Sequence, residues 1–573
     1  MRNIALASSF STWVIVFFGA VFGRIPWVKR LAVPVEVRQI RRKHQAHERS
    51  EDRLSLQEKN FHLNVAVNLA FGSVSLRFPE AWFRSFVDHE SLVSLHRFGW
   101  LDEGVKDHGW DGNVLQNLIT SWGMAHAKGL NCEVLEAYSA SERLINWIYH
   151  LQKFQLTEAS VEANVAKIIR NEFRFLIANL EYKFFGQTGN HIINNARALI
   201  VCGSWFGNSE IIYLGRKIVE SELPNLYTAA SFLREGSLHY HVLVLIWLCE
   251  ISLVLRKANQ SSEKITGFIL NGIEPVGALT YSEDGRRLLP PIGDLSPDLS
   301  PESSLIKLDQ ALKAAELPEI SNWFNAIDSL VNTQFTPSFA RLSQAKFDVF
   351  CRVDELMENP VCFHGHDDHG SISIYLDGEM VMGDLGQYSY SSTQLSRHMK
   401  SAAAHNTYQI DGSPFFYSRR NKFFLKRKSE QVRLSLDSDL SGLTLESSYG
   451  DSRVTRWQRL VDMNNDCIRV CDTIESGNPE SIKTIFWFRC EIYSFNTVSN
   501  TLNLVLNGQR ISADFKAFYN DLDGARLNCS VQIKRGFAAS RYGAVKAAVG
   551  VEVECEPTQR FRGELIITST GPF

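Results

Sequence analysis

The spacing of apolar residues changes once along the chain, and this change limits the fold more than any other feature. From about Leu56 to Leu330, apolar residues recur every three or four positions, in segments such as VEANVAKIIRNEFRFLIANLEYKFF and HYHVLVLIWLCEISLVL. That spacing predicts helices in series, which must bury their apolar faces against one another. After about Thr336 the spacing becomes two, as in SISIYLDGEMVM, where Asp377-Gly378 predicts a hairpin turn. We therefore expect an all-α domain followed by an antiparallel β domain.

The chain has 573 residues, more than one hydrophobic core usually holds. We assign residues 51–335 to the helical domain and residues 336–573 to the β domain. Residues 1–50 contain an uncharged apolar stretch, 4–23, and then a basic stretch. About 20 apolar residues are enough to span a membrane, and basic residues after the span favour a cytoplasmic location for the remainder of the chain. Membrane association through residues 4–23 is therefore one interpretation, and a cleaved signal peptide and a buried helix are the alternatives.

Charge and cysteine usage narrow the partners and the compartment. The formal net charge is −3 and no basic stripe with interleaved aromatic residues occurs, so nucleic acid is not an expected partner. The ten cysteines are scattered, mostly in apolar runs, and we expect buried free thiols and no disulfide framework. Free thiols favour the cytoplasm or the cytoplasmic side of the inner membrane, with the periplasm or secretion as alternatives. The oligomeric state does not follow from the sequence.

The stretch FHGHDDHGSISIYLDG places several histidines and aspartates directly before a predicted strand. On an extended backbone, His364, His366 and Asp368 share one face. Two imidazoles at positions i and i+2 can begin a metal site, and Asp384 and His405 are candidates for the further ligands. Imidazole and carboxylate ligands suit Zn²⁺, with another divalent ion as an alternative. The structural alternative is that these histidines cap loops at the rim of a sheet.

Two polar islands interrupt the apolar helices. GQTGNHIINNARALI carries Asn190 and Asn194 on one helical stripe, with His191 on the adjacent one. REGSLHYHVLVL carries Tyr240 and His241 just before a strongly apolar helix. Polar groups on a buried helix need hydrogen-bond partners or a cavity. Each island alone is explained equally well by an internal hydrogen-bond network and by a binding site.

Together these motifs resemble the heparinase II/III-like polysaccharide lyases, a group that also contains alginate and oligoalginate lyases. The family pattern runs His-x-His-x-Asp, a strand, Asp-x-Gly-x-Tyr and Ala-Ala-His-Asn-Thr, and this chain has HGHDDHGSI, DLGQYSY and AAAHNTYQIDG in that order. RLINW, EYKFFGQTGNHIINNARAL and EGSLHYH match the helical half, so the resemblance covers most of the chain from about Trp110 onward. It implies an incomplete (α/α) toroid followed by an antiparallel β-sandwich-like domain. It also implies a lyase acting on an anionic polysaccharide or oligosaccharide that contains uronic acid.

The resemblance further implies roles for individual residues. It assigns Asn190 and His191 to the substrate-carboxylate and base positions, Tyr240 to the catalytic tyrosine, and His364 to the histidine at the domain junction. The implied ligands of a structural Zn²⁺ are His366, Asp384 and His405. The implied substrate-binding residues are Asn146, Trp147, Asn194, Glu235, His241, Tyr388 and Tyr390. In the absence of the resemblance, Asn146-Trp147 is equally explained as a cap and a core tryptophan.

β-Elimination beside a uronic acid needs a group that holds the carboxylate, a base at C5 and an acid for the departing oxygen. An imidazole titrates near neutrality and suits the base. A phenol titrates near 10 and suits the acid, or both roles if the elimination is syn. Two other functions remain open: a metal-dependent hydrolase acting on a glycan, and a catalytically silent glycan-binding protein of polysaccharide assembly. The uronate polymer and the choice between endo and exo action are not specified by the sequence.

Overall fold

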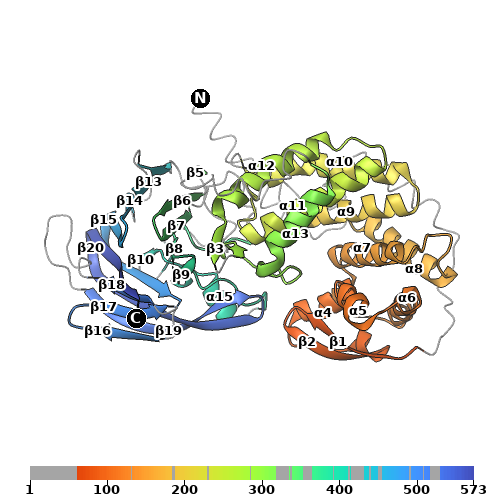
Figure 1. Cartoon of the computed structure of the whole chain (residues 1–573), viewed down its shortest axis with the longest axis horizontal. Coiled ribbons are helices and arrows are strands. Elements are labelled where there is room, and N and C mark those ends of the chain that lie inside the picture. Colours follow the sequence, from red (N-terminus) through yellow and green to blue (C-terminus); the bar gives the residue numbers. More distant parts are fainter. Residues whose placement is uncertain are drawn as a thin grey trace.

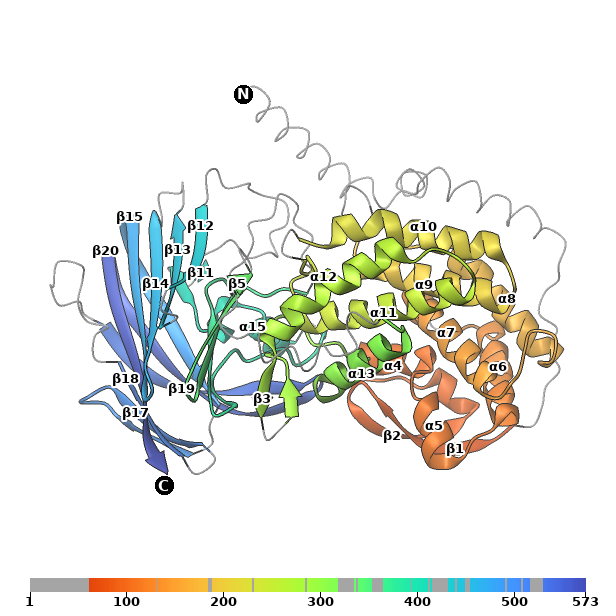
Figure 2. The same cartoon turned by 45° about the horizontal axis from the view of Figure 1, so that its top comes forward.

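The structure, a computed structural model, describes most of the chain after residue 60 (Figures 1 and 2). The described residues are 61–130, 132–183, 188–228, 231–283, 286–317, 334–335, 339–352, 364–391, 393–410, 413–414, 431–437, 441–448, 454–489, 492–506, 509–515 and 529–572. The apolar and basic N-terminal segment, residues 1–50, lies outside them. In both views the helices occupy one side of the molecule and the large sheet occupies the other.

The helical half begins with a β-hairpin, which the apolar spacing did not predict. Strand β1 (Leu63–Leu69) pairs antiparallel with β2 (Gly72–Phe78). The expectation of helices from about Leu56 is therefore wrong for this segment. Val65, Val67 and Leu69 are buried, and the residues between them are exposed, which is the period of a strand with one buried face.

The toroid consists of helices that follow this hairpin. They are η1 (Glu80–Phe83), α4 (His89–Arg97), α5 (Leu101–His108), α6 (Gly112–Ala127), η2 (Cys132–Leu135), α7 (Ala137–Lys153), α8 (Ala163–Ala178), α9 (Asn190–Trp205), α10 (Ser209–Leu226), α11 (Leu238–Lys257), α12 (Glu263–Leu279) and α13 (Pro301–Ala314). A short hairpin of β3 (Tyr281–Glu283) and β4 (Arg286–Leu288) separates α12 from α13. Helix α9 packs against α7, α10 and α11, so its polar residues reach the centre of the helical half.

Helix α11 is a long, largely buried helix of the toroid. Its N-cap is Ser237, whose hydroxyl accepts a hydrogen bond from the Tyr240 backbone N–H at 3.1 Å. By length and composition, α11 is the one helix among the described residues that is apolar enough to cross a membrane, but 78% of its most apolar window is buried in the protein. It is therefore accounted for as a core helix, packed against α9, α12 and α13.

The C-terminal half is an antiparallel β domain, as predicted. Its strands are β5 (Gln334–Phe335), β6 (Phe339–Gln344), β7 (Phe347–Arg352), β8 (Ile372–Leu376), β9 (Glu379–Met382), β10 (Tyr408–Ile410), β11 (Ser413–Pro414), β12 (Gln431–Leu436), β13 (Gly442–Ser448), β14 (Arg456–Met463), β15 (Cys467–Phe488), β16 (Ile492–Asn496), β17 (Thr501–Leu506), β18 (Gln509–Asp514), β19 (Cys529–Arg541) and β20 (Ala544–Pro572), with α15 (Gln394–Met399) and η5 (Ala402–Ala404) in one connection. Long β15 pairs with β9, β10, β14 and β20, which joins the branches of the sheet. Asp377 and Gly378 form the predicted turn between β8 and β9, with φ angles of 49° and 85°.

One cysteine pair corrects the expectation of free thiols. Cys529 and Cys555 lie directly opposite each other on β19 and β20 and form a disulfide. The described cysteines that are free are Cys202, Cys249, Cys351, Cys467 and Cys471. The pair was missed because two cysteines 26 residues apart meet only through the strand register, which the sequence pattern does not reveal. Cysteine usage therefore no longer favours a reducing compartment.

The two halves share a packed junction. The ring of Phe232 in the helical half lies 4.6 Å from that of Phe339 in β6, and Tyr281 of β3 lies 4.2 Å from Tyr375 of β8. These residues belong to the same continuous core as the toroid helices. The junction is thus held by apolar contacts, and side chains from both halves can be fixed there relative to one another.

Candidate active site and metal centre

Three segments cross at the junction and fix the backbone of His364. The His364 backbone N–H donates to Glu235 O at 2.9 Å, and the Asp294 N–H donates to His364 O at 2.8 Å. The Ser237 hydroxyl donates to Asp294 O at 2.6 Å. Gly293 has φ 71°, and a Cβ there would collide with the carbonyl oxygens of Gly236 and His364. Only glycine therefore permits the crossing that brings His364 to the helical half.

A pair of tyrosines lies against His364. The Tyr240 and Tyr390 hydroxyls are hydrogen-bonded at 2.8 Å. The Tyr240 ring stacks on His364 with centroids 3.7 Å apart and planes 7° apart, and Tyr390 Oη lies 3.3 Å from His364 Nδ1. Burial raises the pKa of Tyr240 well above the ordinary value, which outweighs the opposite effect of the Tyr390 hydrogen bond. Tyr240 is therefore a protonated phenol, which suits an acid better than a base.

Asn190, the first residue of α9, is held beside this group. Its backbone N–H and Nδ2 donate to the two carboxylate oxygens of Glu235 at 2.8 and 2.6 Å. The Asn190 Nδ2 also lies 3.4 Å from His364 Nε2. Glu235, implied by sequence to bind substrate, is only 1% exposed. Its contacts are those of a residue that positions Asn190.

His191 follows Asn190 but faces a different partner. Its side chain is 41% exposed, and Nδ1 lies 3.0 Å from Glu181 Oε1. The ring also lies 4.6 Å from that of Tyr138. Burial lowers the pKa of His191, but the hydrogen bond and charge of Glu181 outweigh it, so the pKa is raised overall. An N–H at Nδ1 donating to Glu181 leaves Nε2 as a lone pair that can accept a proton.

Asp294 connects the catalytic candidates to the metal candidates, and the sequence analysis missed it. Its Oδ1 lies 2.8 Å from His366 Nε2, and its Oδ2 lies 3.1 Å from His364 Nδ1 and 2.7 Å from Lys400 Nζ. Burial would raise the pKa of Asp294, but Lys400 and the two histidines lower it below the usual range. The buried carboxylate thus orients both imidazoles. In the sequence it lies in a loop rich in Pro, Gly and Ser, with no pattern to mark it.

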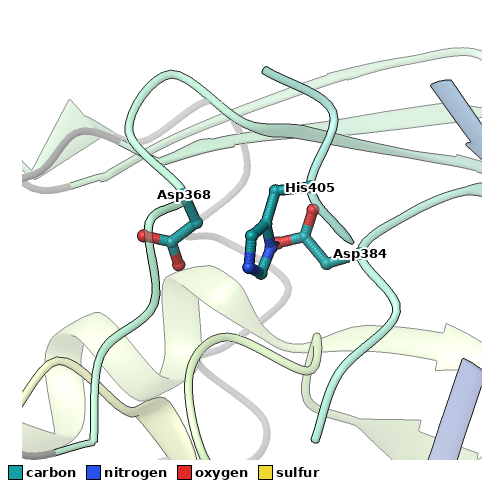
Figure 3. Close-up of side chains that lie close together, drawn as sticks. All are labelled: Asp368, Asp384 and His405. Carbon is teal, nitrogen blue, oxygen red and sulfur yellow. Dashed lines mark ion pairs between the residues drawn. The ribbon is translucent and has the colours of Figure 1, made fainter. Parts of the chain in front are cut away.

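The metal candidates converge from three segments of the β domain (Figure 3). Ligand atoms of Asp368, Asp384 and His405 all lie within 4.8 Å of one another, and the three residues are buried. Figure 3 shows the His405 imidazole between the two carboxylates. His405 Nδ1 lies 3.0 Å from Asp384 Oδ2, and its Nε2 has no hydrogen-bond partner among the described residues. Two of the predicted ligands are therefore together, and Asp368 joins them.

His366, the third predicted ligand, lies at the edge of this group. Its ring centroid is 5.2 Å from that of His405. Its Nε2 is held by Asp294, and its Nδ1 has no hydrogen-bond partner in the described part of the chain. Burial lowers the pKa of His366 to about 4, so the ring is neutral and keeps a lone pair. A carboxylate on the far nitrogen of a ligating histidine is common in metal sites, and the donor set fits Zn²⁺.

In the RLINW motif, Trp147 lies in the core of the toroid and Asn146 hydrogen-bonds to the backbone of a neighbouring segment. Trp147 is fully buried, with its ring 5.3 Å from Trp122 and 5.2 Å from Phe98. The Asn146 side chain donates to the Arg97 carbonyl oxygen at 2.8 Å. In this structure both residues support the toroid core, and Trp147 has no surface to offer a substrate.

The other implied substrate-binding residues differ in their burial and in their contacts. The His241 Nδ1 accepts from the Leu233 N–H at 3.1 Å, its Nε2 lies 2.7 Å from Gly272 O, and it is fully buried. Asn194 is also fully buried and accepts from Arg197 at 3.2 Å. Tyr388 is partly buried and lies on the same loop as Tyr390. The structure thus groups Tyr390 with Tyr240 and His364 and keeps His241 and Asn194 as internal supports.

Residues 338–555 match a family model described as Heparinase II/III-like, C-terminal. The β domain belongs to the heparinase II/III-like family. The matched range contains His364, the tyrosine loop and every metal candidate. No curated protein matches the chain by sequence.

Solved structures extend the likeness in fold from the β domain to most of the chain. A crystal structure of heparinase III matches with a TM-score of 0.67 and 16% identity, over 86% of this chain and 79% of that one. Heparan sulfate lyase HepC from Pedobacter heparinus matches with a TM-score of 0.57 and 14% identity, over 86% and 78%. At these identities the likeness concerns the fold, an (α/α) toroid followed by an antiparallel β-sandwich-like domain.

Proposed function

We propose that this heparinase II/III-like protein is a polysaccharide lyase. It would cleave a uronic-acid-containing glycan by β-elimination and leave an unsaturated uronate at the new end. The observation that carries the proposal is the convergence of Asn190, Tyr240 and His364 from three segments at one junction. Its support from the comparisons is the likeness to heparinase III and to a heparan sulfate lyase.

Asn190 and His364 are suited to hold the substrate carboxylate. Loss of the C5 proton places negative charge on that carboxylate, and hydrogen-bond donors already in position stabilise such charge without reorganising. Glu235 fixes the Asn190 side chain, and Asp294 fixes the His364 ring. Both side chains are therefore oriented before the substrate binds, and His364 donates from Nε2 in its doubly protonated form.

His191 and Tyr240 are suited to the two proton transfers. His191 Nε2 would take the C5 proton, the C5–H electrons would form the C4–C5 double bond, and the C4–O bond would break. Tyr240 would donate its proton to the departing glycosidic oxygen. Burial raises the pKa of Tyr240, which favours this acid role over the alternative in which the tyrosine is also the base. The Tyr240 hydroxyl is hydrogen-bonded to that of Tyr390 here, and when Tyr390 is the donor the Tyr240 proton is free for the departing oxygen.

A divalent ion, Zn²⁺ by the chemistry of the donors, would be held by His366, Asp384 and His405. Such an ion supplies fixed positive charge that cross-links segments of the β domain. Asp294 relates this site to catalysis, because one carboxylate contacts both His366 and His364. Asp384 is 6% exposed and His405 is 1% exposed, so the burial of these ligands weighs against a hydrolase that attacks substrate from the metal.

The deciding experiment follows the ultraviolet absorbance of the unsaturated uronate product during incubation with heparan-type, alginate and hyaluronan-like chains. Tyr240→Phe removes one oxygen and keeps the ring on His364, so we expect the rate to fall by roughly 10²–10⁴-fold. Tyr227→Phe is the matched control, because the Tyr227 hydroxyl is buried with no hydrogen-bond partner among the described residues. It should retain the rate of the original protein.

Three outcomes contradict the proposal. Equal rates for Tyr240→Phe and the original protein would remove the tyrosine from the reaction. Chain cleavage without an unsaturated product, abolished by a chelator, would indicate the hydrolase. Glycan binding without cleavage on any polymer would indicate the silent binding protein.

A further inference from the structure

Asp368 is a buried carboxylate whose burial is not compensated by hydrogen bonds to the described residues. It is 1% exposed, and neither of its oxygens has a hydrogen-bond partner in the described part of the chain. Among the described residues its close ion-pair partner is Arg352, whose Nη1 lies 3.1 Å from Oδ2. A buried ionised carboxylate is costly unless both its charge and its lone pairs are compensated. The contact with Arg352 compensates the charge only.

The Arg352 contact is also not a two-pronged pair. The same Nη1 donates to the Gly236 carbonyl oxygen at 2.9 Å, and Arg352 Nε has no partner among the described residues. An arginine placed to neutralise a carboxylate usually offers two parallel N–H groups. Asp384 shows the contrast, because its Oδ1 accepts from the Ser371 hydroxyl at 2.6 Å. The lone pairs of Asp368 are thus left for another group.

The side chains around the Asp368 carboxylate indicate what its lone pairs would bind. Its carboxylate oxygen is within 4.8 Å of the ligand atoms of Asp384 and His405 (Figure 3). His405 Nε2 and His366 Nδ1 are likewise buried and without hydrogen-bond partners among the described residues. Buried metal sites bring together several side-chain donors and acceptors that have no hydrogen-bond partner within the protein.

We propose that Asp368 is a fourth protein ligand of the metal, together with His366, Asp384 and His405. Four protein ligands fill a tetrahedral zinc site and leave no open position, which makes the centre structural. The inference rests on the metal of the proposed function and not on the elimination reaction. It adds a second tether, since the ion would hold the segment that carries His364 at both His366 and Asp368.

The first experiment measures metal affinity and thermal stability in the full chain after chelation and reloading with Zn²⁺. Asp368→Asn keeps the shape and removes the charge, and the neighbouring Asp367→Asn is the matched control. We expect Asp368→Asn to weaken Zn²⁺ binding by more than the roughly 10–100-fold typical of losing an outer partner. The melting-temperature difference between metal-loaded and metal-free protein should shrink in Asp368→Asn and persist in Asp367→Asn.

A merely structural Asp368 would give the opposite pattern. If its role is to pair with Arg352, Asp368→Asn and Arg352→Met should both destabilise the metal-free protein and leave Zn²⁺ affinity unchanged. That result would overturn the inference. Failure of the original protein to bind Zn²⁺ or any other divalent ion after reloading would overturn it too, while leaving the lyase reaction to the Tyr240 test.

A measurement on the original protein covers the case in which the variant does not fold. Co²⁺ replaces Zn²⁺, and the visible spectrum is recorded before and after addition of azide, which binds to an open coordination position. A closed four-ligand site predicts an unchanged spectrum. A spectrum that changes with azide would show an open position and overturn the inference.

Discussion

At the residue scale, the pH dependence of the proposed reaction is set by His191 and Glu181. The proposed base must be neutral, and Glu181 raises the pKa of His191, so activity should fall as the pH drops through that raised value. In Glu181→Gln the largest contribution that raises the pKa of His191 is gone, the smaller ones of Glu136 and Glu235 remain, and burial still lowers this pKa. We therefore expect the acid limb of kcat/KM to move to lower pH in this variant.

The pH profile of the initial rate measures this shift. Glu158→Gln is a suitable control, because Glu158 pairs with Arg170 at the surface and should leave the profile unchanged. An acid limb at the same pH in Glu181→Gln and the original protein would exclude His191 as the base.

The same scale shows what the sequence could and could not reveal about the site. Asn190, Tyr240 and His364 could be predicted as site residues because each lies in a motif whose order matches a known family. Asp294 and Glu181 could not, because their roles come from contacts with residues in other segments. Asp294 meets His366 across 72 positions, and a single sequence has no signal for that distance.

At the element scale, periodicity predicted the two kinds of domain and missed local exceptions. The hairpin of β1 and β2 obeys a period of two, but it is short and precedes a long helical region, so the surrounding pattern obscured it. The turn at Asp377-Gly378 was predictable, because its residues tolerate the positive φ angles that the turn needs. Strand register lies beyond periodicity, which is why the disulfide between β19 and β20 was missed.

That disulfide yields a prediction about the β19–β20 hairpin. It closes a loop of 26 residues, and a native disulfide of this size usually stabilises the folded state by roughly 2–4 kcal/mol. Thiol reductant should lower the melting temperature of the oxidised original protein and have no effect on Cys529→Ser. Cys467→Ser, which changes a free cysteine, should respond to reductant like the original protein. Peptide mapping that finds both thiols free in protein purified under oxidising conditions would contradict the prediction.

At the scale of the whole molecule, the β1–β2 hairpin and the turn between β19 and β20 meet beside the loop that carries Tyr390. Figures 1 and 2 show β19 and β20 extending from the β domain toward the β1–β2 hairpin. At the hairpin tip, the Phe71 ring meets Tyr388 at 5.4 Å and Tyr542 at 5.5 Å, both edge-on. The Tyr542 hydroxyl accepts from the Tyr390 N–H at 2.9 Å. This aromatic bridge, Phe71 with Tyr388 and Tyr542, therefore supports the loop that carries Tyr390.

The bridge should influence how long polymers reach the site. A chain that passes between the hairpin and the β domain must separate these rings, and an aromatic pair contributes about 0.5–1.5 kcal/mol beyond its buried area. Phe71→Ala should remove that cost, so kcat/KM should rise for a long polymer relative to a short oligosaccharide of the same repeat. Phe537 of β19 is also an exposed aromatic residue, and Phe537→Ala should leave the ratio unchanged. An unchanged ratio in Phe71→Ala would mean that substrate enters without parting the bridge, and the hairpin would then serve only to hold the Tyr390 loop in place.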